Sequence, residues 1–490
     1  MQFNITCMQK ETLKEKTAKG LFWGAINSGS TQLLNIIIGI FLARLLTPGD
    51  YGIVGMISIF TAIAGALQDS GFSNALVNIK DIRDEDYNAV FWFNIIVSFL
   101  MYVILFFCAP LIATFFHQPC LTSLSRFVFL AFFISSFGIA QGAYLMRNMM
   151  NKEKAIIALV AMVGSGIIGI ILAFNGFRYW SLAWQQVLFI TFTDLGRFYY
   201  SKWRPSLKIN LMPVRDMFNF SYKILITTIV NTISQNILSF IFGRLFKPQA
   251  VGNFTQANKW NTNASSFISG TINQVAQPVL ASIRDDGDRE KRVFRNMLRF
   301  TAFLAFPAMF GLALVANEFI ITLISDKWAD SVPLLQILCI GGAFLPFMTL
   351  YQNLSLSSGR SDIFMWCTIL QVIFQIVIII ATHTAGIKTM VLAYTVFNII
   401  WLLVWQYFAH KLISVTLLEV CKDIAPFFLA TVVTMAAVYF VTLPLVKYNI
   451  VLLLTRIVLA AALYFIIMKA AHVQIMDECL KFVAKKLNKD

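Results

Sequence analysis

The sequence has little charge for its length. Only 13% of its 490 residues are Asp, Glu, Lys or Arg, whereas 58% are hydrophobic. A soluble domain carries about 25% charged residues, and the mean hydropathy here is +0.73. No polar segment between the apolar stretches is long enough for a separate soluble domain. The composition therefore excludes a soluble protein and predicts an integral membrane protein.

Signatures of catalysis and of metal binding are also missing. The sequence has no P-loop GxxxxGK[ST], no HExxH and no GxSxG, which argues against a built-in ATPase or hydrolase. Its 7 cysteines include no CxxC pair, and its 4 histidines are scattered. We therefore predict no enzymatic activity, no cofactor and no bound metal, and we leave H⁺ and Na⁺ open as coupling ions.

Long apolar runs make up most of the sequence. A helix needs about 20 apolar residues to cross a bilayer, and the pattern predicts an all-α membrane fold with about fourteen such spans. The predicted spans are 20–43, 51–75, 89–116, 122–146, 155–174, 180–199, 219–243, 251–278, 297–320, 333–356, 363–382, 388–408, 424–443 and 450–468.

The net charge of +15 is unevenly placed along these spans. Most Lys and Arg lie in the two termini and in alternate turns, which is the positive-inside pattern. The polar, basic first ~20 residues lack the apolar core of a cleavable signal peptide, and Met1 and Met8 are both candidate starts. We predict cytoplasmic N- and C-termini in a multi-pass membrane protein, and no nucleic-acid partner.

One phrase occurs twice, 200 positions apart. Arg-Leu-Leu-Thr-Pro at 44–48 precedes Gly52, and Arg-Leu-Phe-Lys-Pro at 244–248 precedes Gly252. The similarity continues at 75–81 and 279–285. Because six spans separate the copies, both would have the same orientation, as in the parallel repeats of transporters. The predicted organisation is an N-terminal lobe at 1–199, a cytoplasmic linker at 200–218, a C-terminal lobe at 219–408, a two-helix appendage at 409–468 and a basic tail at 469–490.

The most polar predicted span, 251–278, places its polar side chains on one helical face. Polar residues in a span usually face the bundle interior or water, so we predict a substrate cavity here. Lys259 is the sharpest candidate, because a fixed positive charge suits an anionic substrate such as phosphate; pairing with a carboxylate is the alternative. The predicted cavity residues are Lys259, Gln256, Asn263, Ser266, Asn273, Asn231, Gln235, Asn35 and Gln68. For single amides, hydrogen bonding between helices is the competing interpretation.

The remaining charged residues near the spans have two interpretations each. Arg44 and Arg244 could form an outer rim or gate, or could anchor helix ends at the interface. Asp69 could bind a coupling cation or form a gate bond. Asp194 and Arg197 have the spacing of a local helix pair.

Basic residues on the inner side raise a similar choice. Arg147, Lys152 and Arg360 could capture a phosphorylated head group from the inner leaflet, or could be topology charge. Arg456, inside the last span, is expected to snorkel toward the outer surface.

Three segments resemble a known family. Lys19–Gly24, Leu42–Gly52 and Gln68–Val77 look like the corresponding parts of Wzx-type polysaccharide exporters, particularly the colanic-acid and teichuronic-acid branch of the multidrug/oligosaccharidyl-lipid/polysaccharide exporter superfamily. The resemblance implies two six-helix lobes with a cationic cavity, here Lys259 with Arg44 and Arg244 at its rim. It also implies that the last two spans form a groove for the lipid tail. One departure is the sparse charge: a single mid-span lysine stands where a cluster of arginines is expected.

The resemblance implies a flippase that moves polyprenyl-pyrophosphate-linked oligosaccharides across the bacterial cytoplasmic membrane by alternating access, for lipopolysaccharide, O-antigen, capsule or exopolysaccharide biosynthesis. The implied partners are the lipid-linked substrate, membrane lipids, a polysaccharide polymerase and glycosyltransferases. A cation-coupled multidrug exporter is the first alternative, and it predicts an acidic, aromatic cavity. A polysaccharide assembly enzyme or scaffold is the second, and it predicts a catalytic acid on an outer loop.

Overall fold

The computed structural model describes residues 13–69, 76, 82–284, 286–443, 449–471 and 476. Within helices, it describes only the backbone of residues 13–28, 64, 66–69, 215–227 and 449. In these ranges every regular element is helical and no strand occurs. Nine of the described helices are long and apolar enough to cross a membrane. The all-α, multi-pass membrane class is thereby confirmed, whereas the number of crossings stays a prediction.

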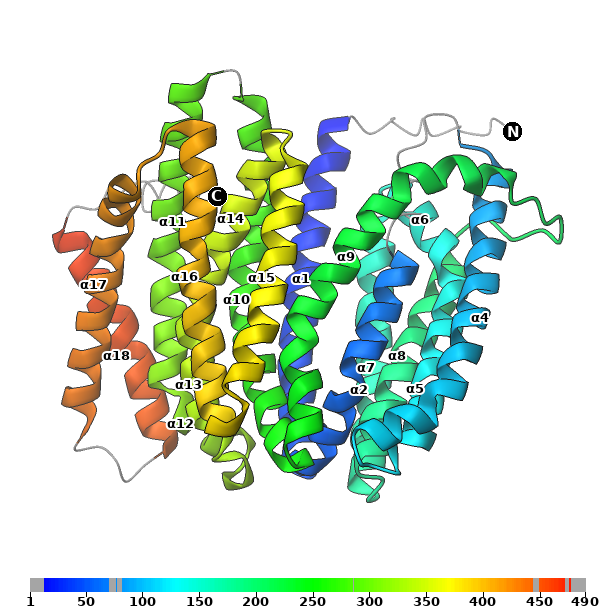
Figure 1. Ribbon diagram of the computed structural model, residues 1–490, viewed down its shortest axis with the longest axis horizontal. Coiled ribbons are helices and arrows are strands. Elements are labelled where there is room, and N and C mark those ends of the chain that lie inside the picture. Colours follow the sequence, from blue (N-terminus) through cyan, green and yellow to red (C-terminus); the bar gives the residue numbers. More distant parts are fainter. Residues whose placement is uncertain are drawn as a thin grey trace, which may run out of the picture. The chain divides into compact units, whose positions relative to one another are not determined.

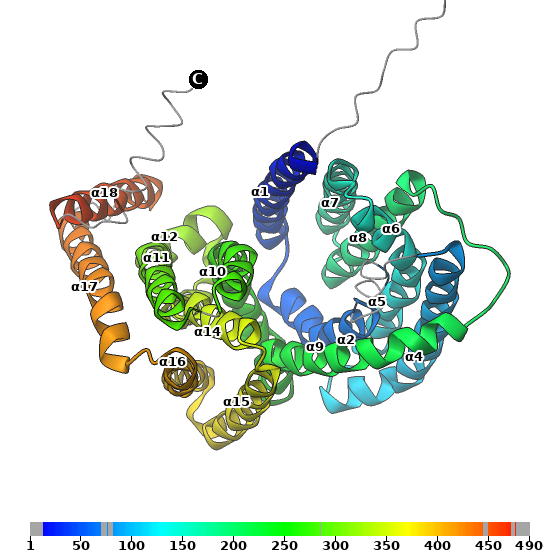
Figure 2. The same cartoon turned by 90° about the horizontal axis from the view of Figure 1, so that it is seen from above.

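The chain forms two compact units (Figures 1 and 2). The first comprises Met1–Leu46 and Met56–Asn236, and the second comprises Thr47–Gly55 and Ile237–Asp490. The short segment Thr47–Gly55 therefore packs with the second unit although its neighbours in sequence belong to the first. The division between the two units falls inside α9, after Asn236. The lobe boundaries predicted from the sequence stay predictions.

The first unit contains all or part of eight labelled α-helices. The first turns of α2 and the last turns of α9 belong to the second unit. The eight helices are α1 (Leu13–Leu45), α2 (Pro48–Asp69), α4 (Asp84–Phe115), α5 (Leu121–Ser135), α6 (Ile139–Arg147), α7 (Asn151–Phe174), α8 (Tyr179–Tyr200) and α9 (Met212–Leu245). A 3₁₀ turn, Ser136–Gly138, joins α5 to α6, so this predicted span is a helix broken once.

The second unit continues from α9 to the last described helix. Its elements are α10 (Pro248–Ser282), α11 (Gly287–Leu314), α12 (Ala316–Glu318), α13 (Ser331–Gly342), α14 (Leu345–Ser357), α15 (Ser361–Ala381), α16 (Ile387–Ile413), α17 (Leu417–Thr442) and α18 (Asn449–Ala470). A π-helical segment, Phe319–Ile324, follows α12. Figures 1 and 2 place α17 and α18 at one edge of this unit, where α17 packs on α11.

The repeated phrase has a structural reason in both copies. α1 ends at Leu45 and α2 begins at Pro48, while α9 ends at Leu245 and α10 begins at Pro248. Proline suits the first turn of a helix because its missing N–H would be unpaired there anyway. The repeat therefore marks two equivalent turns between helices.

The repeated glycines allow a close approach inside the second unit. A Cβ added at Gly52 would overlap the backbone carbonyl of Pro248, and one at Gly252 would overlap that of Pro48. The start of α2 and the start of α10 thus cross with their backbones in contact, and each glycine faces the proline of the other copy. Only glycine fits at such a crossing.

Two connections contain more helix than the boundaries of the predicted spans indicate. The interval between the predicted spans 251–278 and 297–320 is mostly helix, because α10 runs to Ser282 and α11 begins at Gly287. The predicted linker at 200–218 already starts α9 at Met212. Its non-helical part is fixed to α4: Asn88 Nδ2 donates to the Lys208 carbonyl at 2.5 Å, and Trp92 Nε1 donates to the Ser206 carbonyl at 2.7 Å. These side chain–backbone bonds, which hydropathy does not encode, make the connection an ordered part of the first unit.

Candidate functional site

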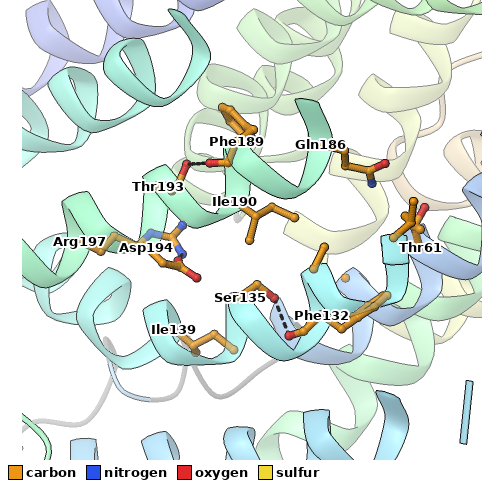
Figure 3. A pocket seen from close by; sticks show the side chains of 13 residues that line it. Thr61, Phe132, Ser135, Ile139, Gln186, Phe189, Ile190, Thr193, Asp194 and Arg197 are labelled. Atoms are coloured by element: carbon orange, nitrogen blue, oxygen red, sulfur yellow. Dashed lines mark hydrogen bonds and ion pairs between the residues drawn. The ribbon is translucent and has the colours of Figure 1, made fainter. Parts of the chain in front are cut away.

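A pocket of about 220 Å³ lies inside the first unit, between α2, α5, α6 and α8 (Figure 3). Figure 3 shows the residues of α8 on one side and those of α5 and α6 on the other. It is lined by Thr61, Gly65, Val128, Ala131, Phe132, Ser135, Ile139, Gln186, Phe189, Ile190, Thr193, Asp194 and Arg197. Six of these side chains are polar, although the helices that carry them are predicted membrane spans. Polar groups at such positions are costly and usually functional.

One charged pair borders the pocket. Arg197 Nη1 lies 3.2 Å from Asp194 Oδ1, one turn away on α8, so the predicted local pair is confirmed. The Asp194 side chain is 7% exposed and that of Arg197 is 36% exposed. The pair rests on two glycines: a Cβ at Gly138 would overlap the Asp194 carboxylate, and one at Gly142 would lie 3.5 Å from the Arg197 guanidinium. Two glycines, one at the end of the 3₁₀ turn and one in α6, thus make the space that the pair occupies.

The hydroxyl groups of the pocket already use their protons. Thr61 donates to the Ser58 carbonyl at 2.8 Å, Ser135 to the Phe132 carbonyl at 3.0 Å and Thr193 to the Phe189 carbonyl at 2.7 Å. The oxygens of Thr61 and Thr193 can still accept a hydrogen bond. The pocket therefore offers hydroxyl oxygens, a carboxylate and an amide, with a guanidinium at its edge, in a wall that is otherwise apolar.

The predicted polar face of α10 is present but is not uniform. Gln256 is fully buried, and neither of its side-chain polar atoms has a hydrogen-bond partner among the described residues. Lys259 is half-buried, and none of the ion pairs found among the described residues involves it. Asn263 is also half-buried, Ser266 is exposed, and Asn273 accepts a 2.8 Å hydrogen bond from Asn353 Nδ2. A cavity along this face stays a prediction.

The remaining predicted cavity residues come from other helices. Asn35 on α1 and Gln235 on α9 are exposed, and Asn231 on α9 is half-buried. Gln68 and the candidate gate carboxylate Asp69 end α2, and their side chains lie outside the described residues. All three described residues belong to the first unit, whereas the α10 face belongs to the second.

The predicted rim residues are exposed, and the arginines among the predicted capture residues are hydrogen-bonded. Arg44 and Arg244 are exposed in the last turns of α1 and α9. Arg147 Nη1 donates to the Leu76 carbonyl at 3.0 Å, and Lys152 is exposed. Arg360 holds Asp362 with two hydrogen bonds of 2.9 Å, which raise the pKa of Arg360. Much of the Arg360 charge is thus balanced locally, and its role in head-group capture stays a prediction.

Other polar groups in the second unit bind one another. Gln371 Nε2 and Gln375 Nε2 both donate to Asn398 Oδ1 at 2.8 Å, linking α15 to α16. Tyr351 donates to Gln406 Oε1 at 2.7 Å, linking α14 to α16. For these amides the interhelical interpretation is the correct one. Among the described residues no group of three His, Cys, Asp or Glu side chains could hold a metal.

Arg456 corrects a prediction. It does not snorkel: its side chain is 7% exposed, and Nη1 lies 3.0 Å from Glu318 Oε1, itself on a 6% exposed side chain. Nε also donates to Thr442 Oγ1 at 3.0 Å. Snorkelling was expected because Arg456 was considered with its own helix alone, whereas the folded chain brings a carboxylate to it.

Sequence reasoning missed most of the pocket. On α8, Gln186, Ile190, Thr193 and Arg197 follow one another at steps of four, three and four, which places them on one helical face. That spacing was available as a signal. Which helices meet around the pocket was not, because that depends on tertiary packing.

Residues 41–333 match the family described as "Polysaccharide biosynthesis protein". The chain belongs to this family. It is 24% identical over 440 residues to the teichuronic acid biosynthesis protein TuaB of Bacillus subtilis, covering 86% of this chain and 88% of that protein. It is 24% identical over 399 residues to the lipopolysaccharide biosynthesis protein WzxC of Escherichia coli, covering 79% and 80%. The resemblance to the polysaccharide exporters is confirmed.

The fold also has a solved counterpart. The structure described as "Lipid II flippase MurJ, inward closed conformation" aligns with a TM-score of 0.77, over 93% of this chain and 100% of that one, at 13% identity. At this identity the likeness establishes the fold alone. This member of the polysaccharide biosynthesis family therefore has the helical fold of a membrane transporter.

Proposed function

We propose that this protein is a flippase that moves polyprenyl-pyrophosphate-linked oligosaccharide repeat units across the bacterial cytoplasmic membrane for surface polysaccharide biosynthesis. The observation that carries this proposal is the family match over residues 41–333, on a chain whose described part contains nine helices able to cross a membrane. The names of the relatives, which refer to teichuronic acid and lipopolysaccharide biosynthesis, support the same substrate class.

The physical problem is to carry a polar head through an apolar layer. Each unpaired polar group in hydrocarbon costs several kcal/mol, so a pyrophosphoryl oligosaccharide needs polar partners on its way. The first unit supplies a polar pocket, and the second supplies the amides and the lysine of α10. The two units alternate access to the two sides of the membrane, while the prenyl tail stays in lipid.

Several finer features belong to this proposal. Both termini lie in the cytoplasm, as the positive-inside pattern favours. The protein transports and performs no catalysis, and the membrane gradient of H⁺ or Na⁺ drives the cycle. Glycosyltransferases supply the substrate, and a polysaccharide polymerase receives it. Lys259 contacts the pyrophosphate, with Arg44 and Arg244 at the rim.

The test is transport by the purified full-length protein in liposomes. A short-chain prenyl-pyrophosphate oligosaccharide is placed in both leaflets, and a sugar-modifying enzyme added outside measures how much of the inner pool becomes accessible. We expect rapid exposure with the wild type and background exposure with empty liposomes. No exposure by folded protein, with several sugar heads tried, would contradict the flippase function.

Lys259 is tested in the same assay. Lys259→Ala should slow exposure at least about tenfold, because a charge-assisted contact with phosphate is lost, and Lys259→Arg should restore part of it. Lys388→Ala, which removes an exposed lysine from the start of α16, is the matched control. Wild-type rates for Lys259→Ala would keep the flippase function and reject the contribution of Lys259.

A further inference from the structure

We infer that the pocket between α2, α5, α6 and α8 of the first unit binds a single uncharged sugar ring. This inference rests on the proposed function, because it names the part of the transported head that this pocket takes. None of the residues predicted to line the substrate cavity lines this pocket. Its charge, its hydrogen-bonding groups and its size carry the argument in turn.

The charge of the pocket favours a neutral ligand. Its lining contains one carboxylate and one guanidinium, Asp194 and Arg197, which lie 3.2 Å apart and balance each other. A phosphate would have to compete with Asp194, and an organic cation would have to compete with Arg197. A neutral group avoids both conflicts, since like charges at close range disfavour binding.

The hydrogen-bonding groups fit hydroxyls. Because Thr61 and Thr193 donate to backbone carbonyls of their own helices, their oxygens are acceptors toward the pocket. Gln186 adds an amide that both donates and accepts. A sugar hydroxyl also donates and accepts, so one ring can bind polar groups on α2 and α8 at once. An apolar drug would cover the Gln186 amide without pairing it, at a cost in binding free energy.

The size limits the ligand to one ring. The volume of about 220 Å³ is below the ~300–1,000 Å³ of pockets that enclose drug-sized molecules. The walls between the polar groups are apolar and include Phe132, Phe189 and Ile190, against which the C–H faces of a pyranose can pack. The rest of the oligosaccharide would remain outside the pocket, so the pocket would read one residue of the repeat unit.

One glycine allows a clean test. Gly65 lines the pocket, and a Cβ added there would have no atom within 4 Å. Gly65→Leu should therefore fill the pocket without displacing neighbouring atoms, and leucine forms helices better than glycine does. Gly29 on α1 is equally open at its Cβ but does not line the pocket, so Gly29→Leu is the matched control.

The measurement is saturation-transfer NMR on purified full-length protein in nanodiscs. The probes are methyl glucopyranoside, its uronic acid and its amino-sugar analogue. We expect the neutral glycoside to bind the wild type and Gly29→Leu, and to bind Gly65→Leu at least about tenfold more weakly. Thr193→Val, which keeps the shape and removes an acceptor, should fall between them.

Three results would overturn the inference: no binding of the neutral glycoside, unchanged binding to Gly65→Leu, or binding of the charged glycosides alone. The liposome assay separates this failure from that of the flippase function. Transport by the wild type without glycoside binding rejects the sugar pocket and keeps the flippase. Glycoside binding without transport rejects the flippase and keeps a sugar-binding pocket.

Discussion

Carboxylate–guanidinium pairs do different work in the two units. In the first unit, Asp194 and Arg197 are neighbours on one helix, share a single 3.2 Å contact and border a pocket. In the second unit, Asp423 on α17 receives two arginines from α11: Arg295 Nε at 2.6 Å and Arg299 Nε at 2.7 Å. The first pair links two turns of one helix at the edge of a pocket, whereas the second joins two helices.

The second unit uses charge in this way at both ends of its last two helices. Beside Asp423, Lys291 of α11 lies 2.9 Å from Glu419 at the start of α17. At the other end, Glu318 of α12 pairs with the buried Arg456 of α18. Between these ends, Tyr464 donates to the Phe303 carbonyl at 3.1 Å. The appendage α17–α18 is therefore bound to α11 and α12 by ion pairs at both ends. The charged pairs that span helices thus fix the architecture of the second unit.

Removing Asp423 should have the largest effect. Asp423→Ala removes the carboxylate that Arg295 and Arg299 share, and each hydrogen bond to a charged group that is lost costs about 1.5–3 kcal/mol. The free energy of unfolding in mixed micelles measures the loss. Protease cleavage in the loops of α17 and α18 should increase as well. A wild-type unfolding free energy would show that the cluster does not hold the appendage.

For the buried pair Arg456–Glu318, the free energy of unfolding lost in a single variant should be recovered in the double variant. Arg456→Leu leaves Glu318 charged and buried, at about 3 kcal/mol, whereas Arg456→Leu with Glu318→Leu should recover most of this, because an apolar replacement of both partners is often neutral. Unfolding of the two single variants and the double variant gives the coupling. Equal losses in single and double variants would argue that Arg456 acts through Thr442 or through packing instead.

A smaller effect is expected at the pocket. Gly138→Ala places a methyl group against the Asp194 carboxylate, at about 1–3 kcal/mol for overpacking, and should also weaken binding of a neutral glycoside by moving the pair. Gly270→Ala on α10, where a Cβ meets no atom within 4 Å, is the control and should leave stability unchanged or slightly improved. Unchanged unfolding and binding in Gly138→Ala would mean that α6 adjusts freely.

The smallest effect is expected for the exposed pair. Arg360 and Asp362 have side chains that are 53% and 56% exposed and hold each other across the start of α15. Asp362→Asn should give no measurable change in unfolding, because solvent screens such pairs. A loss as large as that of Asp423→Ala would contradict the distinction between local and helix-spanning pairs.

Prediction from sequence was strong where the signal is local. The class of fold, the helical turns at Pro48 and Pro248, and the i, i+3 pair of α8 all follow from neighbouring residues. It was weaker where distant segments meet. Arg456 was expected to snorkel, although it pairs with Glu318, and the hydrogen bonds by which Asn88 and Trp92 hold the 200–218 segment to α4 have no signal in the sequence. The cavity residues on α10 stay predictions.

The sequence by itself determined that this chain is a helical membrane protein with a repeated turn, because about 20 apolar residues, a proline and a glycine act through local geometry. The tertiary structure decided which polar groups meet. In a membrane, lipid and protein interior are equally apolar, so hydropathy does not reveal which face of a helix is buried. The carboxylate that Arg295 contacts lies 128 residues away in the sequence. Only tertiary packing brings these two side chains together, and the same holds for the four helices of the pocket.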